Sequence, residues 1–100
     1  MSSFTLRHFD SQKGRLSLVT SSLDHDDFPS VGQQFIDLIS ATVLEKQQDA
    51  DLHSWLIDFE GCQLMLRAEH YSESMWLEAL SAGQSEEELQ YLAGLVAKGI

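Results

Sequence analysis

Three side chains of types that bind metal ions are predicted to converge at one end of a central β-hairpin. They are Asp51, His53 and His70. The predicted pairing places Asp51 opposite His70, with His53 two residues along on the same side, and cross-strand neighbours lie about 4.5–5.5 Å apart. Two imidazoles and one carboxylate can hold zinc or iron with open positions, which is typical of metal-binding or hydrolytic domains. The alternative is a strand-end cluster in which Asp51 only accepts a hydrogen bond from a histidine.

Other reactive residue types in the chain have a structural explanation. The acids at Asp24, Asp26 and Asp27 come directly before a predicted helix, where carboxylates accept free amide hydrogens and match the helix dipole. No calcium-loop spacing follows them. Cys62 has no base beside it in the sequence and is predicted to point inward, as a buried and inert thiol. The sequence contains no glycine-rich phosphate loop and no nucleophile elbow.

Length and composition predict one soluble domain over residues 1–100. The chain has 43% apolar residues, 16 acidic and 6 basic side chains, and a formal net charge of −10. The negative potential of such a charge repels phosphate groups, which argues against nucleic acid and anionic membranes as partners. A single cysteine excludes an intrachain disulfide, and neither a signal-peptide core nor a membrane-spanning run is present. These features predict a cytoplasmic protein.

The central hairpin is the strongest structural signal in the sequence. Glu60-Gly61 is a two-residue turn with glycine at a position that can take a positive φ, and apolar residues alternate with polar ones on both sides. This register pairs Trp55 with Leu66 and His53 with Ala68. The sheet face that it creates is predicted to lie under residues of two helices, with this core: Trp55, Ile57, Phe59, Leu64, Leu66, Phe35, Leu38, Leu89 and Leu92.

The remaining elements predict a two-layer α+β sandwich. Residues 4–9 and 15–21 form a first hairpin, and an apolar stripe indicates a helix that begins at Phe28. A capping box at Ser85 begins a second helix. The predicted order is β-β-α-β-β-β-β-α, with both helices on the inner face of a mainly antiparallel sheet. The crossover through the first helix predicts that the second and third strands are parallel neighbours.

Two further turns extend the sheet on either side of the hairpin. A tight turn at Asp49-Ala50 would place Leu44 opposite Trp55, and a four-residue turn at 71–74 would place His70 opposite Met75. The outer face then carries an unusual number of large apolar side chains for a surface exposed to water. The outward set consists of Val43, Leu52, Leu56, Met65, Trp76 and Leu80, and Arg67 lies beside Glu78.

Two functions from different classes compete. The first is an interaction module that binds a protein partner, or a second copy of itself, through the outer sheet face, because contiguous apolar patches on soluble proteins usually mark contacts. Its binding residues would be Val43, Leu52, Leu56, Met65, Arg67, Trp76 and Leu80, with a mostly acidic rim that favours a basic partner.

The second function is the metal-binding or hydrolytic domain described above, with a divalent metal as cofactor. The first is preferred because small catalytic domains usually show a denser polar constellation. The interaction hypothesis fails if the two helices lie on opposite faces of the sheet, or if the N-terminal hairpin folds over the outer face.

Two segments carry a resemblance to a known family. The run Asp-Ala-Asp-Leu-His-Ser-Trp-Leu-Ile-Asp-Phe-Glu-Gly-Cys (49–62) and the run Ala-Glu-His-Tyr-Ser-Glu-Ser (68–74) resemble a family of short acidic gammaproteobacterial proteins with a domain of unknown function. The similarity extends over nearly the whole chain. It implies a bacterial source and a free-standing cytoplasmic protein, and it implies no activity, cofactor or site residues.

Overall fold

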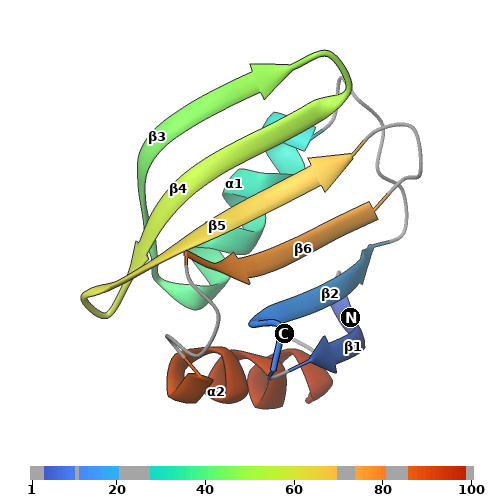
Figure 1. The fold of residues 1–100 in the computed structure, drawn as a ribbon, viewed down its shortest axis with the longest axis vertical. Coiled ribbons are helices and arrows are strands. Elements are labelled where there is room, and N and C mark those ends of the chain that lie inside the picture. The colour runs from blue at the N-terminus through green and yellow to red at the C-terminus, as the bar shows by residue number, and fades with distance from the viewer. Residues whose placement is uncertain (1–3, 11, 21–27, 70–73, 81–85, 99–100) are drawn as a thin grey trace.

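The elements of the chain form one antiparallel sheet with two helices against one of its faces (Figure 1). The computed structural model describes residues 4–10, 12–20, 28–69, 74–80 and 86–98. The α+β class and the predicted element order are confirmed. In chain order the elements are β1 (Phe4–Asp10), β2 (Arg15–Thr20), α1 (Phe28–Ile39), β3 (Thr42–Asp49), β4 (Leu52–Phe59), β5 (Cys62–Glu69), β6 (Ser74–Ala79) and α2 (Glu86–Ala97). Neither helix is long and apolar enough to cross a membrane within these described ranges.

The hairpin of β4 and β5 has the predicted register at every pair, from Phe59 opposite Cys62 to Leu52 opposite Glu69. Its turn has positive φ at both central residues, 53° at Glu60 and 84° at Gly61, as a type I′ turn requires. The Gly61 amide also donates a hydrogen bond of 2.9 Å to Oδ1 of Asp58. A turn whose twist matches the strands therefore fixes which side chains reach the core.

The order of strands across the sheet is β1-β2-β6-β5-β4-β3, and every neighbouring pair is antiparallel. The prediction that β2 and β3 are parallel neighbours is wrong. They run in the same direction, but the three later strands β4, β5 and β6 lie between them. Four strand spacings amount to about 19 Å. A 12-residue helix such as α1 is about 18 Å long. A segment with a helix of this length can therefore span the distance from β2 to β3, and β2 is left to pair with β6.

The registers on either side of the hairpin each differ from the prediction by two residues. In β6, Met75 lies opposite Ala68 and not opposite His70, because β5 ends at Glu69 and β6 begins at Ser74, which pair with each other. A shift of two residues leaves every side chain on its predicted face. Met75 and Leu77 therefore still point into the core, and Trp76 and Glu78 still point outward.

Strand β3 departs further from its predicted register. Its turn to β4 is Ala50-Asp51, so Lys46, not Leu44, lies opposite Trp55. A bulge between Val43 and Glu45 then shifts the pairing by one residue, which moves a side chain from one face to the other. Val43 lies opposite Ile57 and packs against the core. The prediction that Val43 belongs to the outer face is therefore wrong, and Leu44 at the bulge is exposed.

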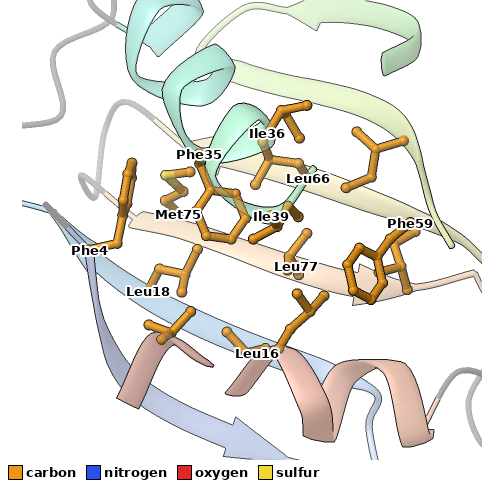
Figure 2. Packing of buried hydrophobic residues seen from close by; sticks show 14 of the residues in the cluster. Phe4, Leu16, Leu18, Phe35, Ile36, Ile39, Phe59, Leu66, Met75 and Leu77 are labelled. Atoms are coloured by element: carbon orange, nitrogen blue, oxygen red, sulfur yellow. The ribbon is translucent and has the colours of Figure 1, made fainter. Parts of the chain in front are cut away.

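The core lies between the inner sheet face and both helices (Figure 2). Helix α2 contributes Leu89, Leu92, Ala93 and Val96, as predicted. Helix α1 buries Phe28, Gly32, Phe35, Ile36 and Ile39, whereas Leu38 is 47% exposed and does not belong to the core, contrary to prediction. All five predicted core residues of β4 and β5 are buried, and they are Trp55, Ile57, Phe59, Leu64 and Leu66. The predicted helix caps at Asp26, Asp27 and Ser85 lie outside the described residues.

Candidate interaction surface on the outer sheet face

The outer face of the sheet consists of the side chains that point away from both helices. Two rows cross its centre, because residues directly opposite each other on neighbouring strands lie side by side. The first row runs from β4 to β2 through Leu56, Met65, Glu78 and Arg15, and the second through Ser54, Arg67, Trp76 and Ser17. No described segment packs against these rows from outside, since both helices share the opposite core (Figures 1 and 2).

Trp76 lies at the centre of the polar contacts on this face. It is only 8% exposed. The guanidinium carbon of Arg15 lies 4.3 Å from its ring centroid, and its Nε1 donates a hydrogen bond of 2.9 Å to Oε1 of Glu78. The same Oε1 lies 4.0 Å from Nε of Arg67. Arg67 and Glu78 therefore form the predicted ion pair, although on a diagonal and not directly opposite each other. These contacts hold the ring of Trp76 in place, so a partner would meet a fixed and mostly covered side chain. The ring is called the platform below.

An apolar recess lies on the β3 side of that platform. Leu56 and Met65 are half buried in it, and Leu80 at its rim is 50% exposed. The recess measures about 320 Å³, and it is lined by Glu45, Gln47, Ser54, Leu56, Gln63, Met65 and Leu80. Three apolar side chains within a polar rim resemble the centre of a protein-binding surface.

A second recess, here called the basic recess, lies on the other side of Trp76, over β1 and β2. Arg7 and Arg15 both line it, together with the hydroxyl-bearing Ser17 and Ser74. Its volume is about 260 Å³, and its full lining is Arg7, Arg15, Ser17, Leu18, Ser74, Met75 and Trp76. The two recesses differ in chemistry, since one presents apolar side chains and the other presents cations.

Six of the seven predicted partner-binding residues lie on the outer face. Leu52, Leu56, Met65 and Arg67 are half buried, Leu80 is exposed and Trp76 is buried under Arg15. The seventh, Val43, lies on the other face, because the bulge in β3 turns it toward Ile57.

Sequence reasoning missed Arg7 and Arg15. Successive side chains of a strand point to opposite faces, and Leu16, the residue after Arg15, is buried. The sequence could therefore have predicted that Arg15 points outward. Its position beside Trp76 was not predictable, because it depends on the pairing of β2 with β6. The rim is therefore not uniformly acidic. Arginines lie over β1 and β2, whereas the acids Glu45 and Asp49 lie on β3, at the other edge.

The proposed metal ligands fall in different surroundings. Asp51 is exposed in the turn between β3 and β4, whereas His53 is buried on the inner face. The ring of His53 lies 4.8 Å from that of Phe28, at an interplanar angle of 34°. His70 lies outside the described residues, so the three-ligand set stays a prediction. Within the ranges that the structure describes, no three His, Cys, Asp or Glu side chains are grouped to hold a metal ion.

The fold and the surface define a two-layer α+β protein that covers one sheet face with helices and leaves recesses on the other. A family model described as "Protein of unknown function (DUF3630)" matches residues 4–97, and the chain belongs to this family. This confirms the expected membership of a family of unknown function. Searches of curated proteins and of solved structures gave no significant match.

Proposed function

We propose that this protein is a small interaction module that binds a protein partner through its outer sheet face. The observation that carries the proposal is the position of the helices. Both pack on the inner face, and no described segment covers Leu56, Met65 and Leu80 on the other. Large apolar side chains in a recess that water can enter are stabilised when a partner covers them.

The apolar recess supplies the centre of this contact. Met65 is unbranched and flexible, so it can adjust to the shape of an inserted side chain. Leu56 and Leu80 provide apolar area beside it, and Glu45 and Gln47 form part of its polar rim. An apolar side chain of the partner would fill the recess, while polar groups around it would fix orientation.

A face, rather than an edge, is the favoured contact. Strand β3 is one edge of the sheet, but it carries the bulge next to Val43 and directs the charged Lys46 to the inner side. Bulges and inward charges are features by which proteins discourage the addition of further strands. Docking onto the flat side avoids both obstacles.

We place this binding in the cytoplasm. The one cysteine, Cys62, leaves no intrachain disulfide to form, which suits a reducing compartment. The net charge of −10 would keep a small domain with an apolar recess soluble and separate from nucleic acid.

The test is a triple substitution of the apolar recess, Leu56→Thr, Met65→Thr and Leu80→Thr. Threonine keeps a good strand propensity while removing apolar area. The variant and the unaltered protein would be compared in affinity capture from native cells and in sedimentation at rising concentration. We expect the triple variant to stay folded and to lose the captured partner, or its self-association.

The matched control is Leu38→Gln on α1, which removes from the helix layer an apolar side chain about as exposed as Leu80 (47% against 50%). It should keep every interaction of the unaltered protein. The proposal fails if the triple variant retains the same partners and association state. It also fails if the triple variant unfolds, because the outer face would then be part of the core.

A further inference from the structure

Two arginines line one recess of a protein that has few basic side chains. The chain contains 6 basic and 16 acidic side chains, yet Arg7 and Arg15 line the same recess of the outer face. They come from neighbouring strands. The β1–β2 ladder has a bulge between Leu6 and His8, which makes Arg7 the extra residue. Bulges redirect side chains, and with this one Arg7 lines the same recess as Arg15.

The two carboxylates opposite Arg15 on its neighbouring strands accept hydrogen bonds from other donors. Asp10 lies opposite Arg15 on β1, but its Oδ1 accepts hydrogen bonds of 3.1 Å from the amides of Gln12 and Lys13. Glu78 lies opposite Arg15 on β6, but its Oε1 accepts the indole hydrogen of Trp76 and lies nearest Arg67. Among the described residues no ion pair joins a carboxylate to Arg7 or Arg15.

The recess also orients one of its two cations, Arg15, before anything binds. Arg15 lies over the face of Trp76, at 4.3 Å from guanidinium carbon to ring centroid, and Trp76 is itself buried and hydrogen-bonded. A guanidinium over an aromatic face keeps its N–H donors in its own plane, where they can grip two oxygens at once. Ser17 and Ser74 add hydroxyl groups to the lining.

We propose that the basic recess binds an oxyanion, a carboxylate or phosphate group held by Arg7 and Arg15 above Trp76. Its volume of about 260 Å³ suits one such group, since pockets for drug-sized ligands start at roughly 300 Å³. The site is independent of the apolar recess, so either can fail without the other. An anionic side chain or terminus of a protein partner and a free phosphate compound share this chemistry.

The overall negative charge does not prevent this binding. The acids of β3 lie four strand spacings from β2, or about 19 Å. Charges in physiological salt are screened over about 8 Å. The acids of β3 therefore contribute little to the potential inside the recess and mainly lower the rate at which anions arrive. The nearby Asp10 and Glu78 accept hydrogen bonds from other donors, so they leave the guanidinium groups of Arg7 and Arg15 without an ion-pair partner among the described residues.

The experiment is an NMR titration of the ¹⁵N-labelled full chain with two probes, inorganic phosphate and the dicarboxylate glutarate. Sodium chloride of equal ionic strength serves as the blank. The signals to follow are the indole N–H of Trp76 and the backbone amide of Ser17. We expect saturable shifts of both signals in the unaltered protein. Arg7→Gln and Arg15→Gln should each weaken binding at least tenfold.

Two further variants separate a built site from a general charge effect. Lys13→Gln removes one positive charge from the adjacent turn, outside the recess lining, and should leave the affinity unchanged. Arg15→Lys keeps the charge but loses the planar fork, so it should weaken binding almost as much as Arg15→Gln.

Each outcome bears on the proposal. Saturation by phosphate alone, by glutarate alone or by both supports the site and tells which oxyanion it takes. Shifts that do not saturate, or that decline equally in Lys13→Gln and Arg15→Gln, would overturn it. Arg7 is exposed on β1, so Arg7→Gln should stay folded and keep the test valid even if Arg15→Gln does not.

Discussion

The Nζ of Lys46 lies 4.3 Å from the centroid of the Trp55 ring, on the inner side of edge strand β3. Trp55 is 2% exposed, although its opposite neighbour on β3 is a lysine and not an apolar residue. The lysine therefore closes the open side of the core with its alkyl chain and places its charge over the ring. This arrangement lets an edge strand cover a tryptophan and still carry an inward charge that discourages aggregation.

Replacing Lys46 by alanine should therefore expose Trp55 and lower stability. We expect the free energy of unfolding to fall by about 0.5–1 kcal/mol, the value of an exposed cation–π contact. Urea unfolding followed by tryptophan fluorescence measures both the loss and the shift of the emission to longer wavelength. Gln47→Ala, the next residue on the strand, is the control and should change neither. Equal stability of Lys46→Ala and the unaltered protein would show that the contact contributes nothing.

The glycines of the two helices should respond in opposite directions to alanine. A Cβ at Gly32 in α1 would lie 3.0 Å from the Trp55 side chain and 3.1 Å from that of Phe28, so the helix could not stay as close to the sheet. We expect Gly32→Ala to destabilise by about 1–3 kcal/mol. Gly94 in α2 is exposed, and a methyl group added there would meet nothing within 4 Å, so Gly94→Ala should stabilise by roughly 0.5–1 kcal/mol through helix propensity. Thermal unfolding of both variants decides the matter, and a stabilised Gly32→Ala would contradict the packing.

The sequence predicts correctly those features that are determined by residues close together along the chain. The β4–β5 register rests on two turn residues and on apolar alternation beside them, and the prediction is correct at every pair. The predicted α2 stripe is correct for the same reason. The neighbours of this hairpin are each displaced by two residues from their predicted positions, because a turn moved by one residue gives an equally good pattern on the same face.

Features that depend on distant pairing were not predictable. Nothing near Arg15 indicates that β2 lies beside β6, a strand about 60 residues later, so the sequence gives no sign of the basic recess. The β3 bulge that turns Val43 inward leaves no signal in an apolar-polar pattern, since an unbulged strand would fit as well. The outer apolar face is predictable because alternation alone assigns Leu56 and Met65 to it.

The type I′ turn at Glu60-Gly61 offers a direct test of backbone strain. Glu60 holds a φ of 53°, a left-handed conformation that costs most residues about 1–2 kcal/mol and that asparagine tolerates better. Glu60→Asn should therefore raise the free energy of unfolding by several tenths of a kcal/mol or more. Gly61→Ala should lower it by about 1 kcal/mol through strain alone, because a Cβ there would touch nothing within 4 Å. Chemical denaturation of the two variants should give shifts of opposite sign, and shifts of the same sign would exclude the I′ geometry.

The hydrogen bond from Trp76 to Glu78 can be measured by a double-mutant cycle. Trp76→Phe keeps a ring under Arg15 but removes the indole donor, and Glu78→Ala removes the acceptor. Each single change should destabilise the protein. Their coupling should be about 1 kcal/mol, below the roughly 1.5–3 kcal/mol of a hydrogen bond to a charged group, because Glu78 is partly exposed. Urea unfolding of the four proteins gives this coupling energy.

The second partner of Glu78 provides the control for that cycle. Arg67→Gln removes the ion pair but leaves the indole hydrogen bond in place, and it should cost less than about 1 kcal/mol because the contact is 4.0 Å long. A coupling energy near zero between Trp76 and Glu78 would mean that Arg15 and burial alone hold the tryptophan. The 2.9 Å hydrogen bond would then contribute little to holding the Trp76 side chain in place.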